Sequence, residues 1–378
     1  LTAAALNLTI ATTAWRLQAS SEAAEGSPNV ARPAPPPISP ATVLPSASEH
    51  RWLLVCYGVS GFAALAFEVV LTRVLILVYG SSVYAFSVVL TGFLLGIGLG
   101  SLVAARRIDR TTDLGGAVGI LQAVIGLSIL ITSPLYDRLP ELVLRMFRAT
   151  GGAWESIMLL EFMTTVGLLL VPTAAMGAMF PLASKIAGAG RPAAGQAVAD
   201  AYTVNTVGAV LGAFAGGFAL IPMLGLQRGM LVLALVNLLL AAVLVRRSAL
   251  LTPERRRVAA LGLVALPFLG LVFLPGWDAR LLNSGVYVYA PDYERLNQGG
   301  GLADDLRRFT LLYYKEGVSA TVSVFRGKYL FMRVNGKTDA GDSPDNLTQR
   351  LLAHVPLLLH PAPKEVGVIG RRGRVTPG

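Results

Sequence analysis

Seven long apolar stretches follow one another through most of the chain. They cover residues 52–79, 83–104, 114–135, 154–186, 196–223, 227–245 and 257–275. Each reaches or approaches the ~20 apolar residues that cross a hydrocarbon core of about 30 Å. Because lipid offers the backbone no hydrogen-bond partners, the pattern predicts helices rather than strands. The 154–186 stretch is too long for one straight crossing, and we expect Pro172 and Pro181 to break or kink it.

Polar residues mark the segments outside these stretches. Residues 136–150 carry Arg and Glu at helical spacing among Leu, Val and Phe, which predicts an amphipathic helix at the membrane surface. Residues 19–50 are rich in Ala, Pro and Ser and have almost no bulky apolar residues, so we expect a disordered linker. Residues 1–18 resemble the end of an apolar helix closed by Arg16, which predicts that the chain is a fragment of a longer repeat.

The chain changes character after residue 275. Residues 276–340 predict a β-rich domain, with strands at 321–325 and 329–334 and a tight turn at Asn335-Gly336. Residues 341–378 predict a helix at 345–358 and an apolar strand at 366–370. The predicted fold is mostly α: a polytopic helical membrane bundle in residues 51–275, followed by a small β-hairpin domain.

The composition agrees with a chain that needs lipid. It is 54% hydrophobic and 14% charged, whereas a soluble domain carries about 25% charged residues. The net charge of +10 lies in short Arg clusters between the apolar stretches. That placement is typical of the cytoplasmic loops of membrane proteins and disfavours nucleic-acid binding. Cys56 is the one cysteine and the histidines lack ligand spacing, so neither a disulfide framework nor a metal site is predicted.

The charges also predict an orientation. The connections 105–113, 185–195 and 246–257 are basic, whereas 80–82 and 223–226 are nearly uncharged. The positive-inside rule therefore places the basic connections in the cytoplasm, and an odd number of crossings leaves the C-terminal domain outside.

Several polar residues interrupt the apolar stretches. Glu68 and Arg73 lie in the first of them, and Glu161, Asp200 and Asn205 lie in or near later ones. A charge in lipid costs several kcal/mol (about 2.5–3.5 on insertion scales) unless it is paired or hydrated. Two interpretations stay open: structural pairing between helices, and a path for a substrate or protons.

Two glycine repeats predict close helix packing. Each repeat places a glycine at every fourth position, at Gly92, Gly96 and Gly100 and again at Gly208, Gly212 and Gly216. Missing side chains let two helix backbones approach closely, and a transport path lined by glycine is the alternative.

The order of motifs along the chain points to a family. In the C-terminal part these motifs are Tyr313-Tyr314-Lys315-Glu316-Gly317, a strand hairpin, Asn335-Gly336-Lys337, His354-Val355-Pro356-Leu357 and His360-Pro361. This part resembles the start of the polyamine aminopropyltransferase (spermidine synthase) domain. The apolar part resembles the membrane-fused spermidine synthase-like proteins of bacteria. It does so in Ser60-Gly61-Phe62, Glu68 to Arg73, Gly80-Ser81-Ser82, Pro172-Thr173, Met176-Gly177, Phe180-Pro181 and Tyr202 to Ala209.

The resemblance implies a protein of the bacterial inner membrane whose residues 341–378 begin a Rossmann-like methyltransferase-type fold. Soluble members of the family transfer an aminopropyl group from decarboxylated S-adenosylmethionine to the amine of putrescine. By resemblance, Asp339, Asp345 and Gln349 are substrate-binding candidates. Gly370 and Gly373 are the candidates for the turn that approaches the nucleoside of the cofactor.

The chain departs from the family pattern at these positions. Asp339 stands where the family has a glutamine, Pro344-Asp345 stands at an Asp-Glu pair, and Thr348-Gln349 at a Tyr-His or Tyr-Gln pair. The glycine turn contains Arg371, Arg372 and Arg374. The family's catalytic aspartates would follow residue 378, so we expect this fragment to be inactive alone. Asp339, Asp342 and Asp345 have a plainer interpretation as solvated loop acids and a helix cap.

Two functions therefore stay open, beside a third possibility that the protein is a pure scaffold. In the first, the complete protein transfers an aminopropyl or other alkyl group to a polyamine or another amine, using decarboxylated S-adenosylmethionine or S-adenosylmethionine. In the second, it is a membrane transporter or assembly protein with a degenerate soluble domain. The resemblance favours a cytoplasmic C-terminal domain, which is opposite to the orientation that the charges predict.

Overall fold

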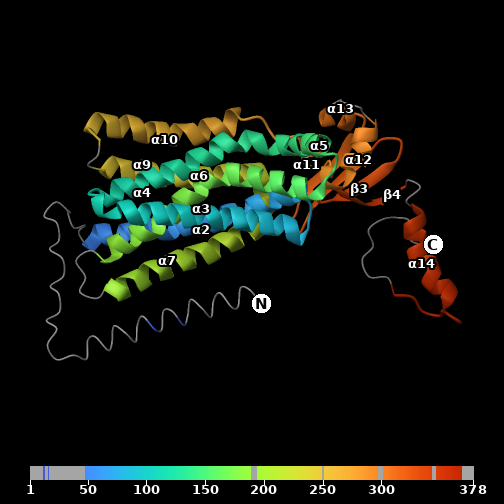
Figure 1. The fold of residues 1–378 in the computed structure, drawn as a ribbon, viewed down its shortest axis with the longest axis horizontal. Coiled ribbons are helices and arrows are strands. Elements are labelled where there is room, and N and C mark those ends of the chain that lie inside the picture. Colours follow the sequence, from blue (N-terminus) through green and yellow to red (C-terminus); the bar gives the residue numbers. More distant parts are fainter. Residues whose placement is uncertain are drawn as a thin grey trace. The chain divides into compact units, whose positions relative to one another are not determined.

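The computed structural model describes residues 47–188, 194–248, 251–296, 301–342 and 346–367, together with Thr12 and Arg16. Apart from those two residues, they belong to one compact unit, Leu44–Gly378. Seven helices in the described part are long and apolar enough to cross a membrane, which confirms the predicted bundle (Figure 1). They are α2 (Ala47–Tyr79), α3 (Val83–Arg107), α4 (Leu114–Thr132), α6 (Trp154–Gly188), α7 (Ala194–Ala215), α9 (Leu226–Arg247) and α10 (Pro253–Phe273).

Some boundaries differ from the prediction. Helix α2 begins at Ala47, inside the expected linker, and the rest of residues 1–46 lies outside the described residues except for Thr12 and Arg16. A π-helical turn (Gly216–Leu220) joins α7 to α8 (Ile221–Leu224), and a short turn η1 (Ile108–Arg110) joins α3 to α4. Consecutive long helices run in opposite directions, so their connections lie alternately at the two ends of the bundle (Figure 1).

The expected break at the prolines of α6 does not occur. Pro172 and Pro181 both lie inside one continuous helix. A proline removes one backbone donor, but neighbouring helices and Ser or Thr side chains can stabilise such a site. Beside Pro172, the Thr173 hydroxyl donates to the Leu169 carbonyl at 2.6 Å and so adds a hydrogen bond to this turn, although the carbonyl that loses its backbone donor is that of Leu168.

The glycine repeats bring helix backbones together, as predicted. A Cβ atom on Gly100 of α3 would lie 1.8 Å from the Ala174 carbonyl oxygen of α6. A Cβ atom on Gly212 of α7 would lie 2.0 Å from the Phe62 carbonyl oxygen of α2. Neither position can accept a side chain without moving a backbone, so the repeats define the α3–α6 and α2–α7 contacts.

The amphipathic segment forms helix α5 (Leu139–Thr150), after the turn η2 (Ser133–Arg138). Its buried face carries Leu139, Val143 and Leu144. Two of its charged side chains, Glu141 and Arg148, contact the short helices of the small C-terminal domain. The helix therefore lies between the bundle and that domain.

The C-terminal domain contains a four-stranded antiparallel sheet in the order β1-β2-β3-β4. The strands are β1 (Thr310–Glu316), β2 (Thr321–Arg326), β3 (Leu330–Val334) and β4 (Lys337–Gly341). The predicted tight turn joins β3 to β4, with φ angles of 49° at Asn335 and 87° at Gly336. Asn-Gly is the dipeptide that tolerates positive φ at both positions.

Residues 276–340, expected to be β-rich, begin with three short helices: α11 (Ala279–Leu282), α12 (Val286–Leu296) and α13 (Leu302–Leu306). Val286, Ala290 and Tyr293 recur at helical spacing and form the buried face of α12. Helix α14 (Asn346–Leu359) agrees with the predicted helix. Of the predicted strand 366–370, residues 366 and 367 are not in a strand and the others lie outside the described residues.

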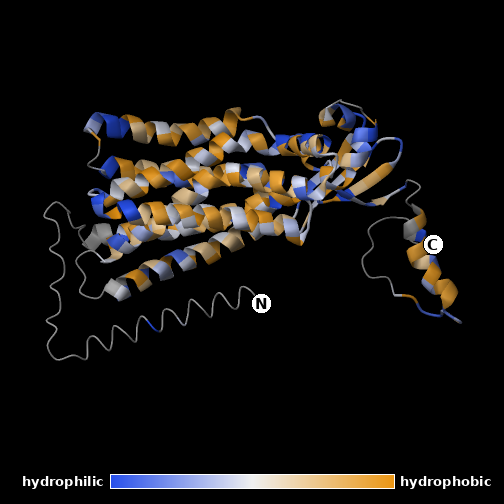
Figure 2. Cartoon of the chain, in the orientation of Figure 1, coloured by the Kyte–Doolittle hydropathy of each residue, from blue (hydrophilic) through white to orange (hydrophobic). Residues whose placement is uncertain are grey.

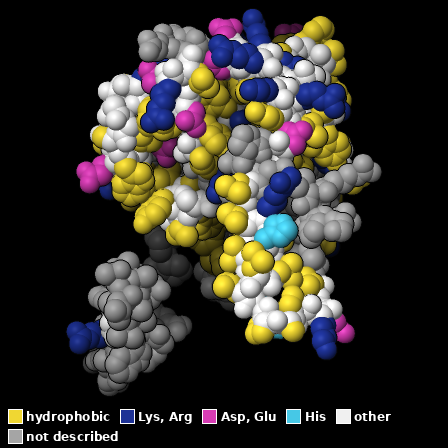
Figure 3. All heavy atoms as spheres, turned by 90° about the vertical axis from the view of Figure 1, so that its right-hand side faces the viewer, with side chains coloured by type: hydrophobic (Ala, Val, Ile, Leu, Met, Phe, Trp, Pro, Cys, Tyr) yellow, Lys and Arg dark blue, Asp and Glu magenta, His cyan; other side chains and the backbone are white. Residues whose placement is uncertain are grey.

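The two ends of the bundle differ in charge. Arg106 and Arg107 end α3, Arg246 and Arg247 end α9, and Arg255 lies in the first turn of α10. All lie at the end away from the sheet, with an apolar band between (Figure 2). The opposite end carries the small domain, whose surface mixes Lys, Arg, Asp and Glu with apolar side chains (Figure 3).

Candidate functional site

The candidate site is the junction where the sheet meets the helix ends. Arg73, near the end of α2, donates hydrogen bonds to the carbonyls of Val318 at 2.6 Å and Gly317 at 3.1 Å. Both carbonyls belong to the loop between β1 and β2. In the part of the chain that the structure describes, Arg73 forms no ion pair with Glu68. The arginine inside the first apolar stretch therefore holds the sheet.

Glu316 makes the second attachment, at the start of α9. Its carboxylate accepts a hydrogen bond from the Leu226 backbone N–H at 2.6 Å. The positive end of a helix dipole favours a carboxylate at this place. Gly225 precedes Leu226 with a φ of 84°, and a Cβ atom there would lie 2.6 Å from the Glu316 carboxylate. The motif Tyr313 to Gly317 thus has a structural role in this chain.

Tyr314 completes the same attachment. Its hydroxyl donates a hydrogen bond to the other oxygen of the Glu316 carboxylate. Burial raises the pKa of Tyr314 above its ordinary value, and the negative charge of Glu316 raises it further. The tyrosine therefore stays protonated and can donate over the whole physiological range.

The Asn335-Gly336 turn forms the third attachment. The Asn335 side-chain oxygen accepts from the Thr321 N–H at 2.9 Å, and the Asn335 carbonyl accepts from the Tyr287 hydroxyl at 3.0 Å. A Cβ atom on Gly336 would lie 3.2 Å from the backbone of Gly285 and 3.6 Å from the Leu77 carbonyl of α2. The turn is thus packed against the helix ends, and its backbone is not open to a substrate.

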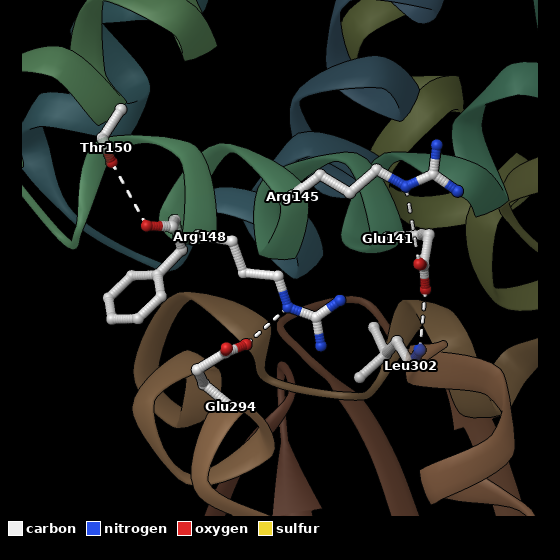
Figure 4. A network of polar contacts seen from close by, with 7 residues as sticks. Glu141, Arg145, Arg148, Thr150, Glu294 and Leu302 are labelled. Atoms are coloured by element: carbon white, nitrogen blue, oxygen red, sulfur yellow. Dashed lines mark hydrogen bonds and ion pairs between the residues drawn. The ribbon is translucent and has the colours of Figure 1, made fainter. Parts of the chain in front are cut away.

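Helix α5 holds the domain from the side. Arg148 forms an ion pair with Glu294 of α12, with Nε and Oε2 2.5 Å apart (Figure 4). Glu141 accepts a hydrogen bond from the Leu302 N–H, at the start of α13, at 2.8 Å. The two contacts fix the short helices over α5.

A buried arginine organises the layer beneath the sheet. The side chain of Arg333 donates to the carbonyls of Asn283 and Ser284, both at 2.8 Å. Its guanidinium lies 5.1 Å from the ring centroids of Tyr289 and Phe331. Arg333 is 6% exposed. The planar guanidinium can lie against aromatic rings while its N–H groups donate hydrogen bonds in its own plane. Lysine could not replace arginine in this role.

A cavity of about 160 Å³ adjoins Arg333 and is also lined by Tyr293, Asp305, Arg308 and Phe309. Asp305 is 3% exposed and lies 3.5 Å from Arg308. The Tyr293 hydroxyl donates to the Ser284 carbonyl at 2.7 Å. Burial raises the pKa of Tyr293, and the positive charge of Arg333 opposes that shift.

Sequence reasoning missed Arg333, Asp305 and Tyr293. The signal for Arg333 was its position two residues after Phe331, on the face of β3 that points to the core. Asp305 carried no comparable signal, because nothing in the sequence distinguishes it from its neighbour Asp304, which is exposed.

The polyamine aminopropyltransferase 2 of Streptomyces coelicolor is 35% identical to the chain over 199 residues, which are 51% of this chain and 33% of that protein. The polyamine aminopropyltransferase of Corynebacterium efficiens is 29% identical over 233 residues, 59% of this chain and 41% of that protein. The polyamine aminopropyltransferase 1 of S. coelicolor is 27% identical over 278 residues, 73% of this chain and 47% of that protein. The chain is related to the polyamine aminopropyltransferases.

The chain spans less than half of the length of each of these polyamine aminopropyltransferases. No protein-family model matches it, and no solved structure does either. The relationship agrees with the resemblance found in its motifs.

The structure describes some of the residues that the aminopropyltransferase resemblance singled out. Asp339 lies exposed on β4, at the edge of the sheet. Gln349 lies in α14, but its side chain is outside the described part, as are Asp345, Gly370 and Gly373. The three substrate-binding candidates therefore stay predictions.

The remaining polar candidates of the apolar stretches do not gather around Arg73. Asp200 is exposed on α7. Asn205 lies against α2, where a Cβ atom on Gly61 would be 2.5 Å from its side-chain oxygen. Glu68 and Glu161 are each partly buried on α2 and α6. Within the described residues, no group of His, Cys, Asp and Glu has the arrangement of a metal site.

Proposed function

We propose that the complete protein is a membrane-anchored aminopropyltransferase, and that this chain supplies its anchor and the N-terminal sheet of its catalytic domain. The observation that carries the proposal is the fastening of the small C-terminal domain to three helices, its sheet through Arg73 and Glu316 and its helix α12 through Arg148, in a chain related to the polyamine aminopropyltransferases. Such attachments hold a domain at a fixed height above the bundle.

The proposed reaction is the transfer of an aminopropyl group to an amine. The amine nitrogen forms a bond to the aminopropyl carbon next to the sulfonium, the bond between that carbon and sulfur breaks, and sulfur leaves as a neutral thioether. The amine then loses one proton to a base. Decarboxylated S-adenosylmethionine supplies the aminopropyl group, and a polyamine or another amine accepts it.

Asp339 is the described residue that we assign to the amine. It lies on the edge strand β4, exposed to solvent, close enough to Tyr287 for its charge to raise the pKa of that tyrosine in addition to the larger effect of burial. An exposed carboxylate attracts a protonated amine without a large desolvation cost. Asp345, Gln349, Gly370 and Gly373 complete the proposed substrate and nucleoside contacts.

The test uses the complete protein in lipid nanodiscs, with labelled decarboxylated S-adenosylmethionine and putrescine. The proposal expects spermidine and methylthioadenosine in equal amounts. Asp339→Asn is expected to raise KM for the amine about tenfold, the effect of losing one charge-assisted contact. Asp304→Asn is the matched control, because Asp304 is an exposed acid whose ion pair is with Arg307, the residue that follows its own short helix. An absence of product from the complete protein would reject the proposal.

A second function is favoured by one observation. The basic helix ends lie opposite the sheet (Figure 2), and the positive-inside rule then places the sheet outside the cytoplasm, away from a cytoplasmic adenosyl donor. That orientation favours a transporter or a membrane-assembly protein. Uptake of putrescine or spermidine by proteoliposomes, without product in the transfer assay, would support it.

A further inference from the structure

A groove runs along the outside of the bundle between α3, α4 and α6. It encloses about 630 Å³ and is lined by apolar side chains, among them Leu99, Val103, Leu121, Val124 and Ala178. At one end the lining becomes polar, with Arg107 and Thr111. We propose that one anionic phospholipid binds here, with an acyl chain in the groove and its phosphate at Arg107.

The packing of small residues explains why the groove exists. A Cβ atom on Gly177 of α6 would lie 2.1 Å from the Ile97 carbonyl of α3, so the two backbones touch. On either side of Gly177, Ala174, Ala175 and Ala178 line the groove with short side chains. Helices α3 and α4 both pack on α6 and form the two walls.

The length of the groove suits a chain from one leaflet. Along α3 the lining extends from Leu99 to Arg107, which at ~1.5 Å per residue is about 12 Å. One leaflet contributes about half of a hydrocarbon core of ~30 Å. The walls expose Val103 and Ile120, so the groove opens sideways, toward the place where lipid chains would lie.

The charge at the polar end selects the headgroup. Arg107 lies in the last turn of α3 beside Arg106, and Arg110 ends the short helix that follows. Lys185 of α6 donates to the Ile108 carbonyl at 2.6 Å, which adds a further cation to this end. A guanidinium binds phosphate through two parallel hydrogen bonds, and basic sites between membrane helices suit anionic lipids.

Native mass spectrometry of the delipidated full chain, in detergent, tests the proposal. Phosphatidylglycerol and phosphatidylcholine with the same acyl chains are added in turn. The wild-type chain is expected to retain one phosphatidylglycerol and to release phosphatidylcholine. Arg107→Gln is expected to weaken phosphatidylglycerol binding about tenfold or more. Arg255→Gln, which removes an exposed cation of α10 at the same end of the bundle but outside the groove, should keep it.

Filling the groove provides an independent variant. Ala178→Phe places a ring inside it and should remove lipid binding, whereas Gly262→Phe places the same ring on α10, where a Cβ atom meets nothing within 4 Å. Equal retention of both lipids, or retention by Arg107→Gln, would overturn the proposal. The proposal would also be overturned if the wild-type chain formed a dimer that Ala178→Phe dissociates, because a second copy of the chain would then occupy the groove.

Discussion

Arg73 and Val318 stand 245 positions apart in the chain, yet the guanidinium of Arg73 lies 2.6 Å from the Val318 carbonyl oxygen. This hydrogen bond joins the first long helix of the bundle to the first hairpin of the sheet. A charged side chain that is costly inside an apolar stretch is thereby placed where backbone carbonyls of the C-terminal domain accept its hydrogen bonds.

Replacing Arg73 should loosen the sheet. In Arg73→Gln both loop carbonyls lose a charged donor, and a hydrogen bond to a charged group contributes about 1.5–3 kcal/mol. We expect faster amide hydrogen exchange in β1 and β2 with little change in α2.

The control for this variant is Arg145→Gln. The Arg145 side chain is 70% exposed and pairs with Glu141 one turn away, and such surface pairs contribute ~0–1 kcal/mol. Equal rates of amide hydrogen exchange in β1 and β2 of Arg73→Gln and Arg145→Gln would show that the Arg73 contacts do not hold the sheet.

The attachment through Tyr314 predicts a loss of stability at high pH. Burial and the charge of Glu316 raise the pKa of Tyr314 above its ordinary value of 10.0. The folded state therefore binds this proton more tightly than the unfolded state does. The stabilisation is fully present below pH 10.0 and declines as the pH rises above that value toward the folded pKa.

Thermal unfolding between neutral pH and pH 11 (the upper value about one unit above the ordinary pKa) measures this decline. Tyr314→Phe should lower stability at neutral pH and make the decline shallower. Tyr313→Phe is the neighbouring control, because Tyr313 is 49% exposed. If the two variants have the same pH profile, Tyr314 is not the group responsible.

The glycine contacts predict opposite outcomes for two alanine substitutions. Gly212→Ala would place a Cβ atom 2.0 Å from the Phe62 carbonyl oxygen, and overpacking of this kind costs about 1–3 kcal/mol. Gly262→Ala meets nothing within 4 Å and should stabilise α10 by about 0.5–1 kcal/mol. Melting temperatures in one detergent compare the two, and a stable Gly212→Ala variant would contradict the described α2–α7 contact.

The orientation of the sheet can be measured with single cysteines. Cys56 is the one native cysteine and is buried, so Cys56→Ala gives a background without thiols. Lys328→Cys lies exposed in the turn between β2 and β3, and Thr252→Cys lies exposed at the opposite end of the bundle. The aminopropyltransferase proposal expects a membrane-impermeant maleimide to label Thr252→Cys in intact cells and to leave Lys328→Cys unlabelled until the cells are opened. The reverse result would favour the second function.

Local patterns predicted the elements of this protein well. Apolar length alone is enough to mark the seven helices that could cross a membrane, because crossing a hydrocarbon core requires a minimum number of residues. The Asn335-Gly336 turn follows from two residues that accept positive φ. The amphipathic spacing of α5 defined both a helix and the face that it buries. In each case the residues that determine the helix or turn lie within that element or next to it in the sequence.

The sequence by itself therefore determined the seven long apolar helices and the hairpin. Only the tertiary structure decided what Arg73, Glu316 and Arg333 contact, that α6 continues through its prolines, and that three short helices precede the sheet. Hydrogen-bond partners separated by tens to hundreds of residues leave no periodic trace in a sequence. A charged side chain is stabilised by whichever donors or acceptors the packed elements bring within about 3 Å, and that distance exists only once the chain has folded.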